Sequence, residues 1–79
     1  MALRFLAIDP DTQGGHCPAM FLDEQTGDVL FIGWTETDPA TLADAAQYSP
    51  VASNETLVRI PARMRALILE ALNDAGEAT

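Results

Sequence analysis

Residues 18–34, PAMFLDEQTGDVLFIGW, constrain the fold most strongly, because two apolar runs flank a turn sequence. Gly27 ends the turn at 24–27 and supplies the positive φ that a hairpin loop of this length usually needs at its last position. The sequence therefore predicts a β-hairpin. In its second strand, residues 29–34, apolar side chains alternate onto both faces, so we expect this strand in the middle of a sheet with Phe31 and Ile32 both buried.

The rest of the first sixty residues predicts two more strands and a short helix. Residues 3–8, LRFLAI, have the β-branched and aromatic content of a strand, and residues 56–60, TLVRI, form a second candidate. Asp38 and Pro39 are an N-cap and a first helical residue, which predicts a helix from there to about Gln47. We expect this helix to lie shallowly on the core, since Leu42 is its one large apolar side chain.

Pro61 opens a second, longer helix. Helical spacing gives it an apolar stripe that consists of Met64, Leu67, Ile68, Ala71, Leu72 and Ala75. Gly76 is the expected stop, with residues 77–79 frayed. The order βββαβα predicts an α+β fold, in which a small, mainly antiparallel sheet carries the amphipathic C-terminal helix on one face of a single domain, residues 1–79.

The composition restricts the partners of such a domain. A formal net charge of −8 argues against nucleic acid or an anionic membrane as the main partner, and it permits a basic protein partner. The charge can equally serve only to keep a small protein soluble. Cys17 is the single cysteine, and no segment has the apolar length of a membrane span, so we expect a reduced, cytoplasmic protein.

The strand ending FLAIDPDTQGG resembles the start of metal-dependent nucleases and phosphotransferases, where an aspartate at a strand end holds Mg²⁺. Asp9 and Asp11 would be the ligands. Those folds need carboxylates from later strands, so loop capping or an Asx-turn is the favoured interpretation of this pair. His16 and Cys17 are the only His and Cys and cannot complete a zinc site within one chain. We expect no catalytic residue, metal or cofactor.

The outer side of the second helix is the candidate partner surface. Leu69 points about 140° away from Met64, so an apolar side chain is expected to face away from the core. The residues around it make up the predicted partner-binding set Ala62, Arg63, Arg65, Ala66 and Leu69. Arginines crowd the start of this helix, where the macrodipole disfavours them. They either pair with carboxylates such as Glu55 or Asp38, or anchor carboxylates of a partner.

Three segments in order carry a family resemblance: Gly14-Gly15-His16-Cys17 before a strand, Gly27-Asp28-Val29 leading through a strand to Thr37-Asp38-Pro39, and residues 57–61 leading into the closing helix. In these the chain resembles a family of small acidic actinobacterial proteins of unknown biochemical function, encoded beside helix-turn-helix (XRE-type) transcription regulators. It departs from that family in its additional N-terminal strand and in Met64, where the family has tryptophan, which also fits a sister group.

The resemblance implies a non-catalytic module that binds and modulates a paired helix-turn-helix regulator, in an arrangement compared to toxin and antitoxin pairs. The implied partner is therefore a DNA-binding protein, and self-association as a homodimer is a further possibility. The competing hypothesis is a small metal-dependent nuclease or phosphotransferase that uses Asp9 and Asp11.

Overall fold

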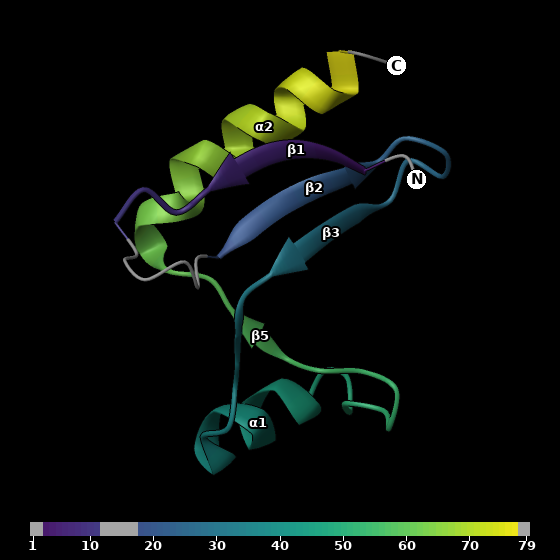
Figure 1. Cartoon of the computed structure of the whole chain (residues 1–79). Helices are drawn as coiled ribbons and strands as arrows, with labels where there is room; N and C mark the ends of the chain where they lie inside the picture. Colours follow the sequence, from purple (N-terminus) through teal and green to yellow (C-terminus); the bar gives the residue numbers. More distant parts are fainter. Residues whose placement is uncertain (1–2, 12–17, 78–79) are drawn as a thin grey trace.

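The computed structural model describes residues 3–11 and 18–77 and is a small α+β protein with an antiparallel sheet (Figure 1). Its elements are β1 (Leu3–Ile8), β2 (Ala19–Asp23), β3 (Val29–Ile32), β4 (Trp34–Thr35), α1 (Pro39–Ala46), β5 (Val58–Arg59), the 3₁₀ helix η1 (Ala62–Met64) and α2 (Arg65–Glu77). This order agrees with the predicted one, except that the second hairpin strand is divided into β3 and β4. Within the described ranges, no helix has the length and apolar character needed to cross a membrane.

The predicted hairpin is present and joins β2 to β3. Gly27 has a φ of +82°, as expected, and its N–H donates to the carbonyl of Asp23 over 2.8 Å. The Asp23 carboxylate accepts the N–H of Gln25 at 2.9 Å, while the Asp23 N–H donates to the Asp28 carbonyl at 2.8 Å. The loop is therefore fixed by bonds within a few residues of one another, which explains why its position was predictable.

The prediction that residues 29–34 form the central strand is wrong. The sheet order is β1-β2-β3, so β2 is central and β3 lies at an edge, where Phe31 is 40% and Ile32 55% exposed. The strand also ends at Ile32, because Trp34 pairs with Arg59 in a separate two-stranded sheet. Apolar residues on both faces of a strand indicate that burial of both faces would be favourable, but they do not show that other segments of the same chain bury them.

The core lies between β1, β2 and α2. It is built on Ala7, Met20 and Ala71, with the partly buried Leu6, Leu67 and Ile68 packed around them. A bulge between Phe5 and Ala7 adds one residue to β1, and both Leu6 and Ala7 contribute to this core. The helix across one face of the sheet is thus confirmed.

The closing helix departs from its prediction at both ends. Pro61 caps the 3₁₀ turn η1, and the α-helix itself begins at Arg65. It continues through Gly76 to Glu77, so the expected stop at Gly76 is wrong; glycine in a helix costs only about 0.5–1 kcal/mol relative to alanine. Of the predicted stripe, Leu72 is 43% exposed and the side chain of Ala75 lies outside the described part, as do residues 78–79.

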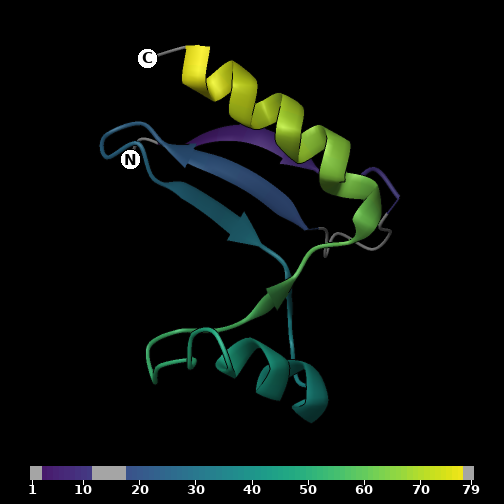
Figure 2. The ribbon, with the colours of Figure 1, turned by 180° about the vertical axis from the view of Figure 1, so that it is seen from behind.

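The remaining elements form a second part, the α1 lobe (residues 34–59), which extends away from the sheet beyond the end of β3 (Figures 1 and 2). The strands β4 and β5 pair over two residues each, and the Glu36 N–H continues their ladder to the Leu57 carbonyl at 2.9 Å. The predicted strand 56–60 is therefore present but shorter. Asp38 caps α1 by accepting the Thr41 N–H at 3.0 Å, and Pro39 is its first residue, both as expected.

Gly33 connects the sheet to the α1 lobe. Its backbone packs so closely on β5 that a Cβ atom would lie 2.8 Å from the Ile60 Cδ1 atom and 3.0 Å from the Arg59 carbonyl oxygen. A side chain at this position would force Ile60 and the backbone of Arg59 to shift, which explains the glycine between β3 and β4.

Candidate functional site

Asp9 is the one buried charged residue among those described, and Arg63 holds it. Arg63 Nε donates to Asp9 Oδ1 at 2.8 Å and Nη2 to Oδ2 at 2.6 Å, while the Asp9 side chain is fully buried. This hydrogen-bonded carboxylate raises the pKa of the Arg63 guanidinium above its ordinary value. The two-point contact joins the end of β1 to η1 and acts as a structural clasp.

Asp11 lies beside this clasp. Its N–H donates to Asp9 Oδ1 at 3.1 Å, which is the Asx-turn that the sequence favoured. Its own carboxylate is exposed and 3.8 Å from Arg63 Nε. Among the residues described, no three His, Cys, Asp or Glu side chains are placed to hold a metal ion, while His16 and Cys17 fall outside those residues. In addition, the guanidinium of Arg63 is hydrogen-bonded to both oxygens of Asp9, the carboxylate that the metal hypothesis needs as a ligand.

A second ion pair fixes the α1 lobe. Arg59 Nε donates to Glu36 Oε1 at 2.6 Å, and Arg59 Nη2 lies 2.6 Å from the same oxygen as an ion pair. Glu36 Oε2 accepts the Asp38 N–H at 3.1 Å. The Asp38 N–H and, next, the Arg59 guanidinium lower the pKa of the Glu36 carboxyl. The hydroxyl and then the N–H of Thr41 lower the pKa of Asp38. These charges stabilise the start of α1 against β5.

Two of the three arginines near the start of the helix, Arg59 and Arg63, thus pair within the chain, but the predicted partners Glu55 and Asp38 are wrong. Glu36 and Asp9 take their place, since strand pairing and the packing of η1 bring together residues that are distant in sequence. Arg65 is exposed, and no described carboxylate lies within the 4 Å of an ion pair. Of the two arginines expected on the partner surface, Arg65 alone projects without such a contact.

The outer side of α2 has the exposure that the sequence predicted. Leu69 is 64% exposed, and Ala62 and Ala66 are exposed as well. Arg63, by contrast, turns toward Asp9. The outer side of α2 is therefore a narrow apolar patch with one arginine, Arg65, that forms no ion pair with a described carboxylate. The role of this patch in partner binding stays a prediction.

A broader apolar surface covers the face of the sheet opposite α2, and we call it the open face. The strand register places its large side chains, which are Leu3, Phe5, Ile8, Phe21, Leu30 and Ile32. All but Phe21 are 41–57% exposed. The rings of Phe5 and Phe21 meet edge to face, with centroids 6.1 Å apart. An unshielded face of this kind typically marks an interaction site.

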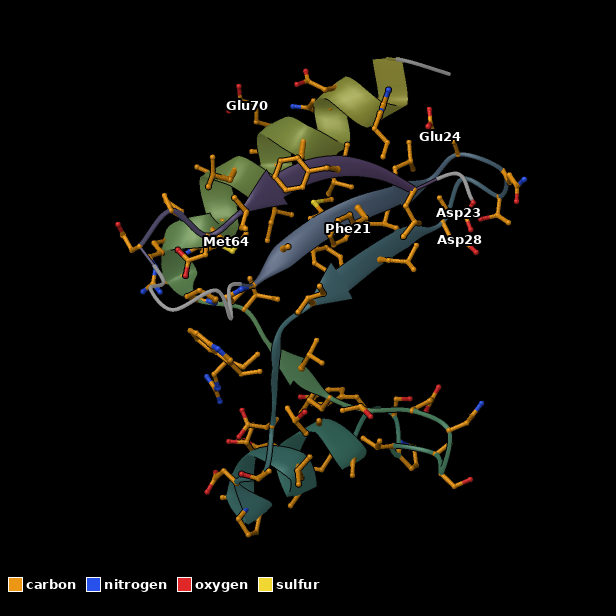
Figure 3. All side chains as sticks on the ribbon, viewed as in Figure 1. Phe21, Asp23, Glu24, Asp28, Met64 and Glu70 are labelled. Atoms are coloured by element: carbon orange, nitrogen blue, oxygen red, sulfur yellow. The ribbon has the colours of Figure 1, made fainter. Side chains whose placement is uncertain are left out.

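Carboxylates border the open face at its hairpin end. Asp23, Glu24 and Asp28 lie together there, at the end of the sheet away from Met64 (Figure 3). By register Asp23 shares the open face with Leu3, its partner on β1. The surface therefore combines an apolar centre with an acidic border at one end.

The α1 lobe contains an open hollow of about 410 Å³ between the end of α1 and the following loop. Ala45, Pro50, Val51 and Leu57 supply apolar parts of its wall. Its one ionisable side chain, Glu55, accepts the Ala52 N–H at 2.9 Å, which is a local turn contact. The hollow therefore presents no group poised for catalysis.

The molecule is more extended and more exposed than a compact protein of its size. Its radius of gyration is 14.1 Å, against about 11.6 Å for a compact chain of this length. Its accessible surface is 5876 Å², whereas a monomer of 8.5 kDa is expected to expose about 4,650 Å². The excess of roughly 1,200 Å² exceeds the area of about 800 Å² that one partner buries in a standard protein interface.

No protein-family model, curated protein or solved structure matches this chain. The family resemblance seen in the sequence therefore stays a prediction.

Proposed function

We propose that this protein is a non-catalytic regulatory module that binds and modulates a paired helix-turn-helix DNA-binding regulator, with the open face as the main contact surface. The observation that carries the proposal is the apolar face of a three-stranded sheet whose other side packs on α2. The class of partner follows from the family resemblance and from charge.

The apolar content of the open face favours a folded protein as the ligand. Aromatic and aliphatic side chains at the centre of a contact supply most of the binding free energy, and Phe5 and Phe21 form a preassembled aromatic pair there. The excess surface of the whole molecule, to which the α1 lobe also contributes, exceeds the area that one partner buries in an interface of standard size. A small molecule would cover only a part of such a flat area.

The charge distribution favours a basic partner. The net charge is −8, and Asp23, Glu24 and Asp28 border one end of the open face. DNA-binding regulators carry arginine and lysine surfaces that contact phosphates. We therefore expect fast association with such a regulator, and an affinity that falls as the salt concentration rises.

The test compares two matched substitutions in a titration against the regulator encoded beside the gene. Phe5→Asp places a charge on the open face, beside Phe21 of the central strand, and Leu69→Asp places one on the outer side of α2; both side chains are mostly exposed. We expect Phe5→Asp to weaken binding at least about 100-fold, a loss typical of the few aromatic residues that supply most of the binding free energy, while Leu69→Asp changes it little.

The reverse result would move the contact to α2 and support the set Ala62, Arg63, Arg65, Ala66 and Leu69. Failure of the unmodified chain to bind the regulator at low salt would refute the proposed function. Thermal melts of both variants establish that each remains folded.

A further inference from the structure

We propose that two copies of this chain join through the outer edges of their β3 strands, antiparallel and centred on Leu30, into one six-stranded sheet. This inference goes beyond the proposed function and does not depend on it. It names a second surface, at the edge of the sheet and not on its open face, and a second copy of the chain as the occupant.

The backbone of β3 has hydrogen-bonding groups that face away from β2. In an antiparallel pair of strands, hydrogen-bonded and non-bonded residue pairs alternate. Because the Asp23 N–H donates to the Asp28 carbonyl, the next hydrogen-bonded pairs between β2 and β3 are Phe21–Leu30 and Ala19–Ile32. The N–H and C=O groups of Val29 and Phe31 then point outward. No other described backbone group bonds to them.

The side chains of β3 are exposed on both faces. Val29 and Phe31 lie on the same face as α2 but beyond its reach, because α2 lies along β1 at the far side of the sheet (Figures 1 and 2). Leu30 and Ile32 lie on the open face. All four are 37–55% exposed, so an added strand would shield apolar surface on each side.

The two edges of the sheet differ in their protection against pairing. On β1, a bulge interrupts the strand and Arg4 adds a charge, and both are features that discourage an added strand. On β3, residues 29–32 are four consecutive apolar residues with no charge, proline or bulge. Natural proteins rarely leave such an edge unpaired.

The edge is complementary to itself. In a two-fold pairing centred on Leu30, Val29 of each copy faces Phe31 of the other, and the outward groups of these two residues supply four inter-chain hydrogen bonds. Leu30 meets Leu30 of the second copy in the close, non-bonded position. Each pair joins β-branched, aromatic or aliphatic side chains of the kind that stabilises adjacent strands.

The acidic character of the chain does not oppose this arrangement. Asp28 faces Ile32 of the second copy, so the two Asp28 carboxylates are offset by four residues, or about 14 Å along the strands. That separation exceeds the screening length of about 8 Å at physiological salt. The two hairpin loops point to opposite ends of the joined sheet, and their carboxylates stay apart.

Analytical sedimentation over a wide concentration range tests the pairing. It compares the unmodified chain with two variants that carry a lysine on the same face of β3. The unmodified chain is expected to reach twice its mass of 8.5 kDa. Leu30→Lys brings two lysines face to face and should raise the dimer dissociation constant about tenfold or more. Ile32→Lys is the matched control, since it faces Asp28 of the second copy and should leave the dimer intact.

Hydrogen exchange on the unmodified chain gives a readout that does not depend on a variant that folds. The N–H groups of Val29 and Phe31 should gain protection as the concentration rises, while that of Leu30, bonded within the sheet, should be protected throughout. A chain that stays monomeric overturns the inference. So does a dimer that Leu30→Lys leaves unchanged, or one that both lysine variants dissociate equally.

Discussion

The guanidinium of Arg63 holds both carboxylate oxygens of Asp9 from a position 54 residues further along the chain. The contact closes the end of β1 onto the turn that starts the last helix, so it fixes where α2 begins to pack on the sheet. Asp9 itself is only 3% exposed, which makes it the most buried charged residue in the described structure, whereas the side chain of Arg63 remains 42% exposed.

Replacing Asp9 should therefore destabilise the fold. Asp9→Ala removes both hydrogen bonds from Arg63 and the one from the Asp11 N–H, and we expect it to lower the free energy of unfolding by about 1.5–3 kcal/mol. Asp11→Ala is the matched control, because its carboxylate is exposed and 3.8 Å from Arg63 Nε, and it should change stability by less than about 0.5 kcal/mol. Urea denaturation of both variants measures the difference, and equal effects would show that the clasp is not stabilising.

The same two residues decide the metal hypothesis. We expect no Mg²⁺-dependent hydrolysis of nucleic acid or phosphate esters, because Arg63 already occupies the Asp9 carboxylate. An activity that is lost in Asp11→Asn, a variant expected to fold normally, would establish the nuclease or phosphotransferase alternative. An assay of purified protein with and without chelator separates the two interpretations.

The acidic groups at the start of α1 should make the fold sensitive to acid. The pKa values of Glu36 and Asp38 lie below the ordinary 4.5 and 3.8, so each carboxylate stabilises the folded state above those pH values. That contribution is lost as the pH falls through the lower folded-state pKa. We expect the melting temperature to fall below about pH 4.5, and to fall less steeply in Glu36→Gln. Identical pH profiles would contradict this assignment.

Alanine substitution should destabilise the fold for different reasons at Gly27 and at Gly33. At Gly33 a methyl group would meet the Arg59 carbonyl oxygen at 3.0 Å, and we expect Gly33→Ala to cost about 1–3 kcal/mol. At Gly27 there is open space, so the strain comes only from the φ of +82°, which costs about 1–2 kcal/mol for alanine. Structures of the variants would distinguish a displaced β5 in the first from a locally altered loop in the second.

Substitutions on opposite sides of α2 should differ sharply in their effect on stability. Leu69→Asp alters a side chain that is 64% exposed, and its effect on the free energy of unfolding should stay within about 0.5 kcal/mol. Leu67→Asp places a charge against the core and should cost several times as much. Thermal melts compare them, and unfolding of the Leu69 variant would mean that this side of the helix is covered.

Local signals allowed much of this fold to be predicted. Gly27 in the hairpin loop and Asp38 before Pro39 act on backbone groups a few residues away, so their sequence neighbourhood contains the whole interaction. The stripe that packs α2 on the sheet is likewise a property of one segment.

The relations between distant segments could not be predicted in this way. Nothing near Asp9 indicates Arg63 as its partner, and the apolar pattern of 29–34 does not reveal that the strand divides at Gly33. The open face was missed for the same reason, although one signal was available. Both strands of the hairpin and the first strand carry apolar residues on two faces, whereas the chain has one long amphipathic helix, enough for a single face.

The way in which the α1 lobe is attached has a consequence for the order in which the protein loses structure. None of the residues of α1 is buried, and two short strands beside Gly33 connect the lobe to the rest of the molecule. Opening of this lobe exposes partly buried side chains such as Leu42 and Leu57 but no fully buried residue of α1, so we expect it to require less free energy than separation of α2 from the sheet. The amide hydrogens of the lobe should therefore exchange with solvent through a local opening whose free energy depends little on denaturant, while those of β2 should exchange only on global unfolding.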